Sequence, residues 1–102
     1  MNAENSGLKW RTFRTLLPDK LIMVTEFSNN RTQFNNVPTT DADKGNQYVQ
    51  YYKLLRQEAN LGAAFSFALT WPGQDVNREG WVFKNGETQI AGTVGAALQA
   101  GL

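Results

Sequence analysis

Two short apolar runs, separated by a helical pattern, favour an α/β fold for this chain. The first run, "LIMVTEF" at 21–27, is apolar on both faces of an extended strand. The second, "GAAFSFALT" at 62–70, alternates Phe65, Phe67 and Leu69 with smaller residues. Two strands that a helix connects form a parallel pair. Strands that are apolar on both faces are typical of a parallel sheet covered by helices. The sequence therefore predicts a βαβ unit.

Three helices are predicted around these strands. Residues 8–17 carry an apolar pattern that we interpret as a buried helical face, made of Leu8, Trp10, Phe13, Leu16 and Leu17. Residues 88–100 predict a last helix, in which Ile90, Val94 and Leu98 recur every four residues. Just before it, Asn85-Gly86 is either the turn of a β-hairpin or the turn that leads into this helix.

The central helix is predicted over 41–59. Thr40 and Asp43 form a capping-box pattern at its start. One stripe of this helix is aromatic and apolar, and we interpret it as the side that covers the sheet rather than as a binding surface. The stripe consists of Tyr48, Tyr52, Leu55 and Ala59, with Val49 and Tyr51 beside it.

Composition excludes several classes of function. The 102 residues, 41% apolar and 19% charged, predict a single domain over 1–102. The chain has no cysteine and no histidine, so we expect no disulfide, no zinc site and no Ser-His or Cys-His nucleophile, and we expect no metal and no cofactor. Acid–base chemistry falls to carboxylates, Lys or Tyr.

Charge and hydropathy indicate a soluble protein with no nucleic-acid or membrane partner. The net charge is +1 with the signs interspersed, and the basic residues of "LKWRTFRTLLPDK" at 8–20 are interpreted as the solvated side of a helix. We expect no signal peptide and no transmembrane segment, because no basic flank precedes an apolar stretch and no apolar run is long enough. The cellular location stays open.

Glu26 is the candidate catalytic residue. Regular strand alternation puts Ile22, Val24 and Glu26 on one face, with the carboxylate at the carboxyl end of the strand. That end carries the catalytic residues in α/β barrels. The competing interpretation is an exposed carboxylate that pairs with Arg31 or another surface cation.

Three segments together resemble a known family of enzymes. "LPDKLIMVTEFSNN" at 17–30, "KGNQYVQYYKLLRQ" at 44–57 and "LGAAFSFALTWPG" at 61–73 are similar to the last quarter of a (β/α)₈-barrel glycoside hydrolase of the cellulase-like, two-glutamate retaining clan. The resemblance covers nearly the whole chain, with 8–17 as helix 6, 41–59 as helix 7 and 88–100 as helix 8. It implies a partial TIM-barrel unit of two parallel strands with three covering helices.

The resemblance also implies roles for individual residues. Glu26 matches the nucleophile at the end of strand 7, and Trp71 matches the strand 8 tryptophan that forms the floor of the −1 sugar subsite. Trp71 is equally consistent with a residue that closes the core, and we interpret the other tryptophans as core. Asn29 and Asn30 follow the first strand, where they can hydrogen-bond sugar hydroxyls or serve the turn. The implied ligand is a polysaccharide or oligosaccharide.

The chain departs from the family in its second carboxylate. The family carries its general acid in an Asn-Glu pair at the end of strand 4, which has no counterpart here, and a full barrel needs eight strands and about 250 residues. Only Asp75 and Glu79 follow the second strand closely enough to approach Glu26. A pair of Glu26 and Asp75 is one candidate for the two carboxylates, and the spacing along the sequence does not fix the distance between them.

Two functions therefore stay open. One is a glycoside hydrolase-like protein that acts on β-linked glycans, and the other is a non-catalytic barrel remnant that self-assembles or binds carbohydrate weakly. A unit of two strands leaves strand edges and apolar faces uncovered, so we expect a homo-oligomer through its strand edges. Four chains would close a barrel and two would form a four-stranded layer, and the sequence does not choose between them.

Overall fold

The fold is an α/β unit with a two-stranded parallel sheet. The computed structural model describes residues 7–29, 40–70, 79–83 and 86–102. In this part of the chain the order is α1 (Arg11–Leu16), β1 (Ile22–Phe27), α2 (Asp41–Leu55), β2 (Leu61–Ser66) and α3 (Gln89–Gln99). The two strands pair in parallel. The prediction of an α/β fold with two parallel strands and three helices is confirmed.

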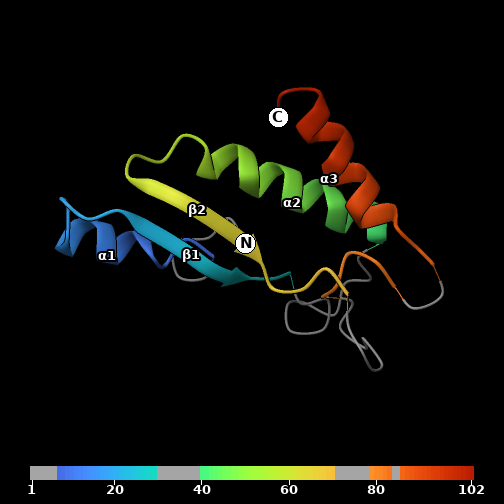
Figure 1. The fold of residues 1–102 in the computed structure, drawn as a ribbon, viewed down its shortest axis with the longest axis horizontal. Coiled ribbons are helices and arrows are strands. Elements are labelled where there is room, and N and C mark those ends of the chain that lie inside the picture. The colour runs from blue at the N-terminus through green and yellow to red at the C-terminus, as the bar shows by residue number, and fades with distance from the viewer. Residues whose placement is uncertain (1–6, 30–39, 71–78, 84–85) are drawn as a thin grey trace.

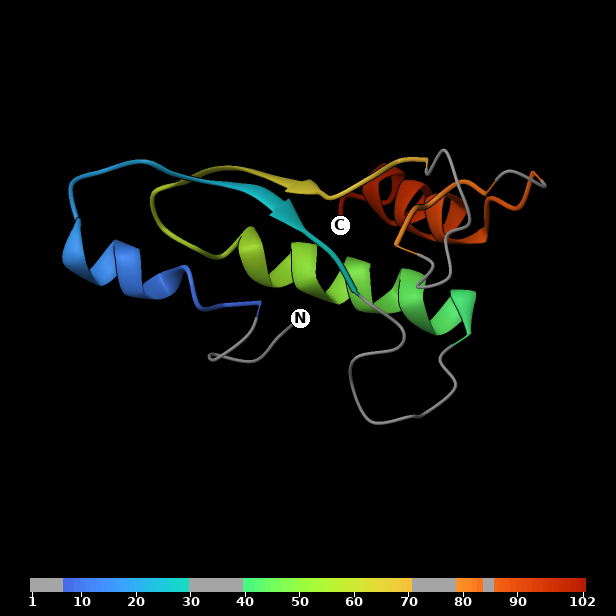
Figure 2. The ribbon, with the colours of Figure 1, turned by 90° about the horizontal axis from the view of Figure 1, so that it is seen from below.

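The helices lie on one side of the sheet. Figure 2 shows α1 and α2 on the same side of the two strands, and Figure 1 shows α2 running alongside β2. The last helix, α3, packs against α2 rather than against the strands. The expectation that three helices cover the sheet is therefore wrong for α3, and among the described elements no helix lies on the second face.

The start of α2 is set by the predicted capping box. The Asp43 backbone N–H donates to Thr40 Oγ1 at 3.1 Å, and the Thr40 N–H donates to the Asp43 carboxylate at 3.2 Å. The helix ends at Leu55, earlier than predicted, because the chain then turns and Asn60 adopts a left-handed φ of 60° before β2. The short connection returns the chain directly to the sheet.

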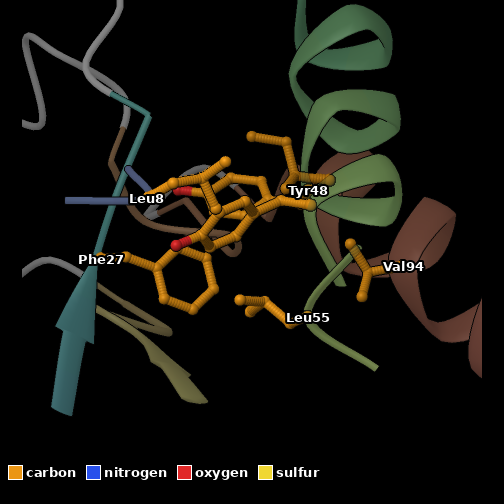
Figure 3. Close-up of a cluster of buried hydrophobic side chains, with 7 residues drawn as sticks. Leu8, Phe27, Tyr48, Leu55 and Val94 are labelled. Atoms are coloured by element: carbon orange, nitrogen blue, oxygen red, sulfur yellow. The ribbon is translucent and has the colours of Figure 1, made fainter. Parts of the chain in front are cut away.

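An aromatic cluster between β1 and α2 forms the centre of the core. The Phe27 ring lies 5.9, 4.8 and 5.4 Å, centroid to centroid, from the rings of Tyr48, Tyr51 and Tyr52. Figure 3 shows Phe27 directed from β1 toward Tyr48 of α2. The buried set is completed by Leu8, Leu55, Ile90 and Val94. The interpretation of the α2 stripe as core is confirmed for Tyr48 and Leu55, which are buried, and for Tyr52, which packs against them, and Tyr51 is fully buried as well. It is wrong for Ala59, which is exposed and follows the end of the helix.

The strand β1 contains a bulge that changes which residues share a face. Val24 pairs with Ala64, but the next pair is Phe27 with Ser66, so β1 has one residue more than β2 in this interval. As a result Val24 and Phe27 both pack into the core, whereas Glu26 is exposed. The expectation that Glu26 shares the face of Ile22 and Val24 is therefore wrong.

Residues of α1 are exposed where burial was predicted. Leu8 is buried and Trp10 is half-buried, but Phe13, Leu16 and Leu17 are 60%, 68% and 51% exposed. The reason is that α1 contacts the end of α2 through its charged side, where Arg11 and Arg14 both pair with Glu58. The apolar side of α1 consequently faces away from α2.

The turn at Asn85-Gly86 combines features of the two predicted alternatives. Position 85 lies outside the described residues, but Gly86 has a φ of 88° and its N–H donates to the Phe83 carbonyl oxygen at 2.9 Å, while the Phe83 N–H donates to the Glu87 carbonyl oxygen at 2.9 Å. These two bonds are those of a tight hairpin turn, and α3 begins directly after it, at Gln89, so no strand of the described residues follows the turn. In α3 the prediction holds for Ile90 and Val94, which are buried, and fails for Leu98, which is 59% exposed.

Candidate functional site

The described residues form one cavity at the carboxyl end of the sheet. Parallel strands end at the same edge, so the residues that follow β1 and β2 come together there. The cavity has a volume of about 370 Å³ and is lined by Glu26, Phe27, Ser28, Phe67 and Glu79. Two carboxylates and two aromatic rings thus border the same space.

The orientation of Glu26 follows from the bulge in β1. Because Phe27 takes the core position next to α2, the preceding residue projects on the other side of the strand. Glu26 is exposed and borders the cavity. The sequence thus identified the position and the strand end, but it assigned the side chain to the wrong face.

The second carboxylate is that of Glu79. Its Oε1 atom accepts a hydrogen bond of 2.6 Å from Ser28 Oγ, which links the segment after β2 to the end of β1. Sequence reasoning placed Glu79 close enough to approach Glu26 but considered Asp75 as its partner. Asp75 lies outside the described residues. The signal for Glu79 was only its distance along the chain from the end of β2.

Asn29 anchors the end of β1 to α2. Its backbone N–H donates to the Tyr48 hydroxyl oxygen at 3.1 Å, and its side-chain amide donates to the Gln47 carbonyl oxygen. The amide predicted to bind sugar hydroxyls is therefore engaged within the protein. The other two predicted binding residues, Asn30 and Trp71, lie outside the described residues.

The hydroxyl of Tyr48 is buried and bound to the residue that follows Ser28 of the cavity. Burial raises the pKa of its hydroxyl above the usual value of 10.0, and the Asn29 N–H offsets part of this rise. The nearby Glu79 carboxylate raises the pKa further. At neutral pH the hydroxyl is protonated, and it accepts the Asn29 N–H that fixes the end of β1 to α2.

The chemistry available at this cavity is that of carboxylates and aromatic surfaces. Within the described ranges, no three residues of the types that bind metals through carboxylate, imidazole or thiolate come together. No helix in these ranges is both long and apolar enough to cross a membrane. Two carboxylates that border one cavity can act as an acid and a nucleophile, or as a nucleophile and a base.

The resemblance to retaining barrel glycoside hydrolases stays a prediction from the sequence. The three segments that carry it are short, and they include Trp71 and other residues outside the described ranges. Comparisons with protein-family models, with curated proteins and with solved structures find no match to this chain.

Proposed function

We propose that this chain is a glycoside hydrolase-like unit related to retaining (β/α)₈-barrel enzymes, with Glu26 in the position of the nucleophile. The sidedness of the sheet supports this proposal. In a barrel, helices cover only the outer face of the strands and side chains fill the inner face. Here α1 and α2 lie on one side of the strands, and Glu26 at the end of β1 is exposed while its neighbour Phe27 packs against α2.

The observation that carries the proposal is that Glu26 and Glu79 line the same cavity. A retaining glycosidase needs two carboxyl groups about 5–5.5 Å apart. The Glu26 carboxylate attacks the anomeric carbon while Glu79 gives its proton to the oxygen of the breaking glycosidic bond. Water then hydrolyses the glycosyl ester, and Glu79 accepts the proton of that water. Glu79 thereby replaces the acid that the family carries on strand 4.

The cavity also offers a surface for a sugar ring. Phe67 borders the cavity and is 38% exposed, and aromatic faces stack on the C–H faces of sugars. Trp71, four residues further on, stays the predicted platform of the subsite next to the scissile bond. Together these residue types favour a polysaccharide or oligosaccharide with β-linkages as the substrate.

Hydrolysis of aryl β-glycosides tests the proposal. We expect slow release of the phenol by the wild-type chain, and a loss of at least 100-fold in Glu26→Gln and in Glu79→Gln, because each amide abolishes one of the two steps. Asp19→Asn is the control, since Asp19 is an exposed carboxylate in the turn before β1, at the opposite end of the sheet. Equal activity in all three variants would reject the proposal.

A second candidate function is a non-catalytic barrel remnant that self-assembles or binds carbohydrate weakly. The exposed apolar residues of the sheet favour it, because Leu21, Met23 and Phe65 are 64%, 59% and 56% exposed. Binding of an oligosaccharide without any hydrolysis would support this second function. Isothermal titration of an oligosaccharide into the Glu26→Gln variant separates the two functions, since carbohydrate binding by a remnant does not depend on that carboxylate.

A further inference from the structure

The second face of the sheet is apolar and uncovered. Val24 and Ala64 pair with each other and both pack toward the core, so the residues that alternate with them project on the opposite side. These residues are Met23, Thr25 and Phe65. We refer to the surface formed by Leu21, Met23, Thr25, Phe65 and Leu69 as the open sheet face.

The contact between Leu21 and Gly62 extends this surface toward the start of the strands. A Cβ atom on Gly62 would fall 2.8 Å from Leu21 Cδ2, so the leucine side chain lies directly over the glycine. At the other end, in the segment that follows the end of β2 at Ser66, Leu69 is 62% exposed. The open sheet face thus runs along both strands.

The size of this surface is that of a weak interface. Its four apolar side chains expose roughly 100 Å² each, or about 400 Å² in total, which lies in the range of the largest apolar patch on a typical monomer. When two such faces meet, about 800 Å² is buried, which is the low end for a contact between proteins and fits a dimer that dissociates on dilution. None of the five residues is charged, so the face presents no repulsion to a copy of itself.

We propose that the open sheet face packs against the same face of a second copy of this chain. The product is a two-fold symmetric dimer with two sheets at the centre, about 10 Å apart, and the α2 helices outside. This inference goes beyond the proposed function and beyond an assembly through strand edges, because it assigns the contact to side chains of one face.

The carboxylates determine the direction in which the two sheets stack. Glu26 and Glu79 lie at the carboxyl end of the strands, next to one end of the open sheet face. If the two copies ran in the same direction, four carboxylates would gather at one end, and like charges repel. An antiparallel arrangement keeps the two cavities at opposite ends of the dimer.

Light scattering and sedimentation equilibrium test this inference. We expect a mass of twice the 11.4 kDa chain at tens of micromolar, falling to one chain on dilution. Met23→Glu and Phe65→Glu each weaken dimerisation at least tenfold, because they bury a carboxylate in the contact. Leu98→Glu is the matched control, since Leu98 is 59% exposed, as is Met23, but lies on α3. Far-UV circular dichroism confirms that each variant is folded.

Several outcomes would overturn the inference. They are the mass of a single chain at all concentrations, a mass of four chains, or a dimer that Met23→Glu weakens no more than Leu98→Glu does. A dimer that persists in Met23→Glu would instead indicate pairing through strand edges. Glu26→Gln leaves the mass unchanged, so a failure of the proposed hydrolysis and a failure of the dimer can be told apart.

Discussion

Replacing Phe27 tests the bulge that directs Glu26 away from the helices. Phe27 is only 9% exposed and contacts three tyrosine rings at 4.8 to 5.9 Å. Removing a buried phenylalanine costs about 3–5 kcal/mol. Because single domains have a free energy of unfolding of only about 5–15 kcal/mol, Phe27→Ala should remove about a fifth of it or more.

Urea unfolding, followed by circular dichroism, measures this loss. Phe13→Ala is the matched control, since Phe13 is 60% exposed and its removal should cost about 0.5 kcal/mol or less. If Phe27→Ala does not fold, Phe27→Leu supplies the measurement, with an expected loss of about 1–2 kcal/mol. Equal losses at positions 27 and 13 would show that Phe27 lies outside the core. The strand would then alternate regularly, and Glu26 would face α2.

Three further predictions concern the helices. Gly45→Ala should destabilise the protein because the new Cβ would lie 2.8 Å from Thr93 Cβ on α3. Gly92→Ala should stabilise it by up to about 1 kcal/mol, because the new Cβ has no atom within 4 Å and alanine favours the helix. Thermal unfolding compares the two variants. Thr40→Ala should cost about 1 kcal/mol in urea unfolding by removing the cap of α2, and an unchanged midpoint would contradict the capping role. Burial raises the pKa of Glu58, but hydrogen bonds from the two arginines of α1 more than offset this and hold it below its ordinary 4.5. The stability that ionised Glu58 contributes is therefore present above pH 4.5 and is lost as the pH falls through the lowered pKa of the folded state. Acid should thus destabilise the wild type more than Glu58→Gln.

Much of the architecture was predictable because local patterns and tertiary contacts agree. The capping box of Thr40 and Asp43 needs only neighbouring residues, so it could be read directly from the sequence. The tyrosines of α2 also match the side that the helix buries, whereas the strands bury only one of their two apolar faces. The α/β order follows from these elements alone.

The errors arise where a contact between distant segments decides the outcome. The bulge in β1 exists because Phe27 packs among the tyrosines of α2, and strand periodicity carries no trace of it. Likewise, the apolar side of α1 is exposed because two of its arginines pair with Glu58, which follows α2. Glu79 joins the cavity through its bond to Ser28, which spacing along the chain does not reveal.

Covalent trapping tests the central claim most directly. A 2-deoxy-2-fluoro glycoside with a good leaving group forms a glycosyl ester that hydrolyses slowly, so the nucleophile retains the sugar. Mass spectrometry of the intact chain should show the added mass of one glycosyl group, and peptide mapping should place it on Glu26. A chain that gains no mass, or that carries the sugar on another residue, would contradict the assignment of Glu26 as the nucleophile.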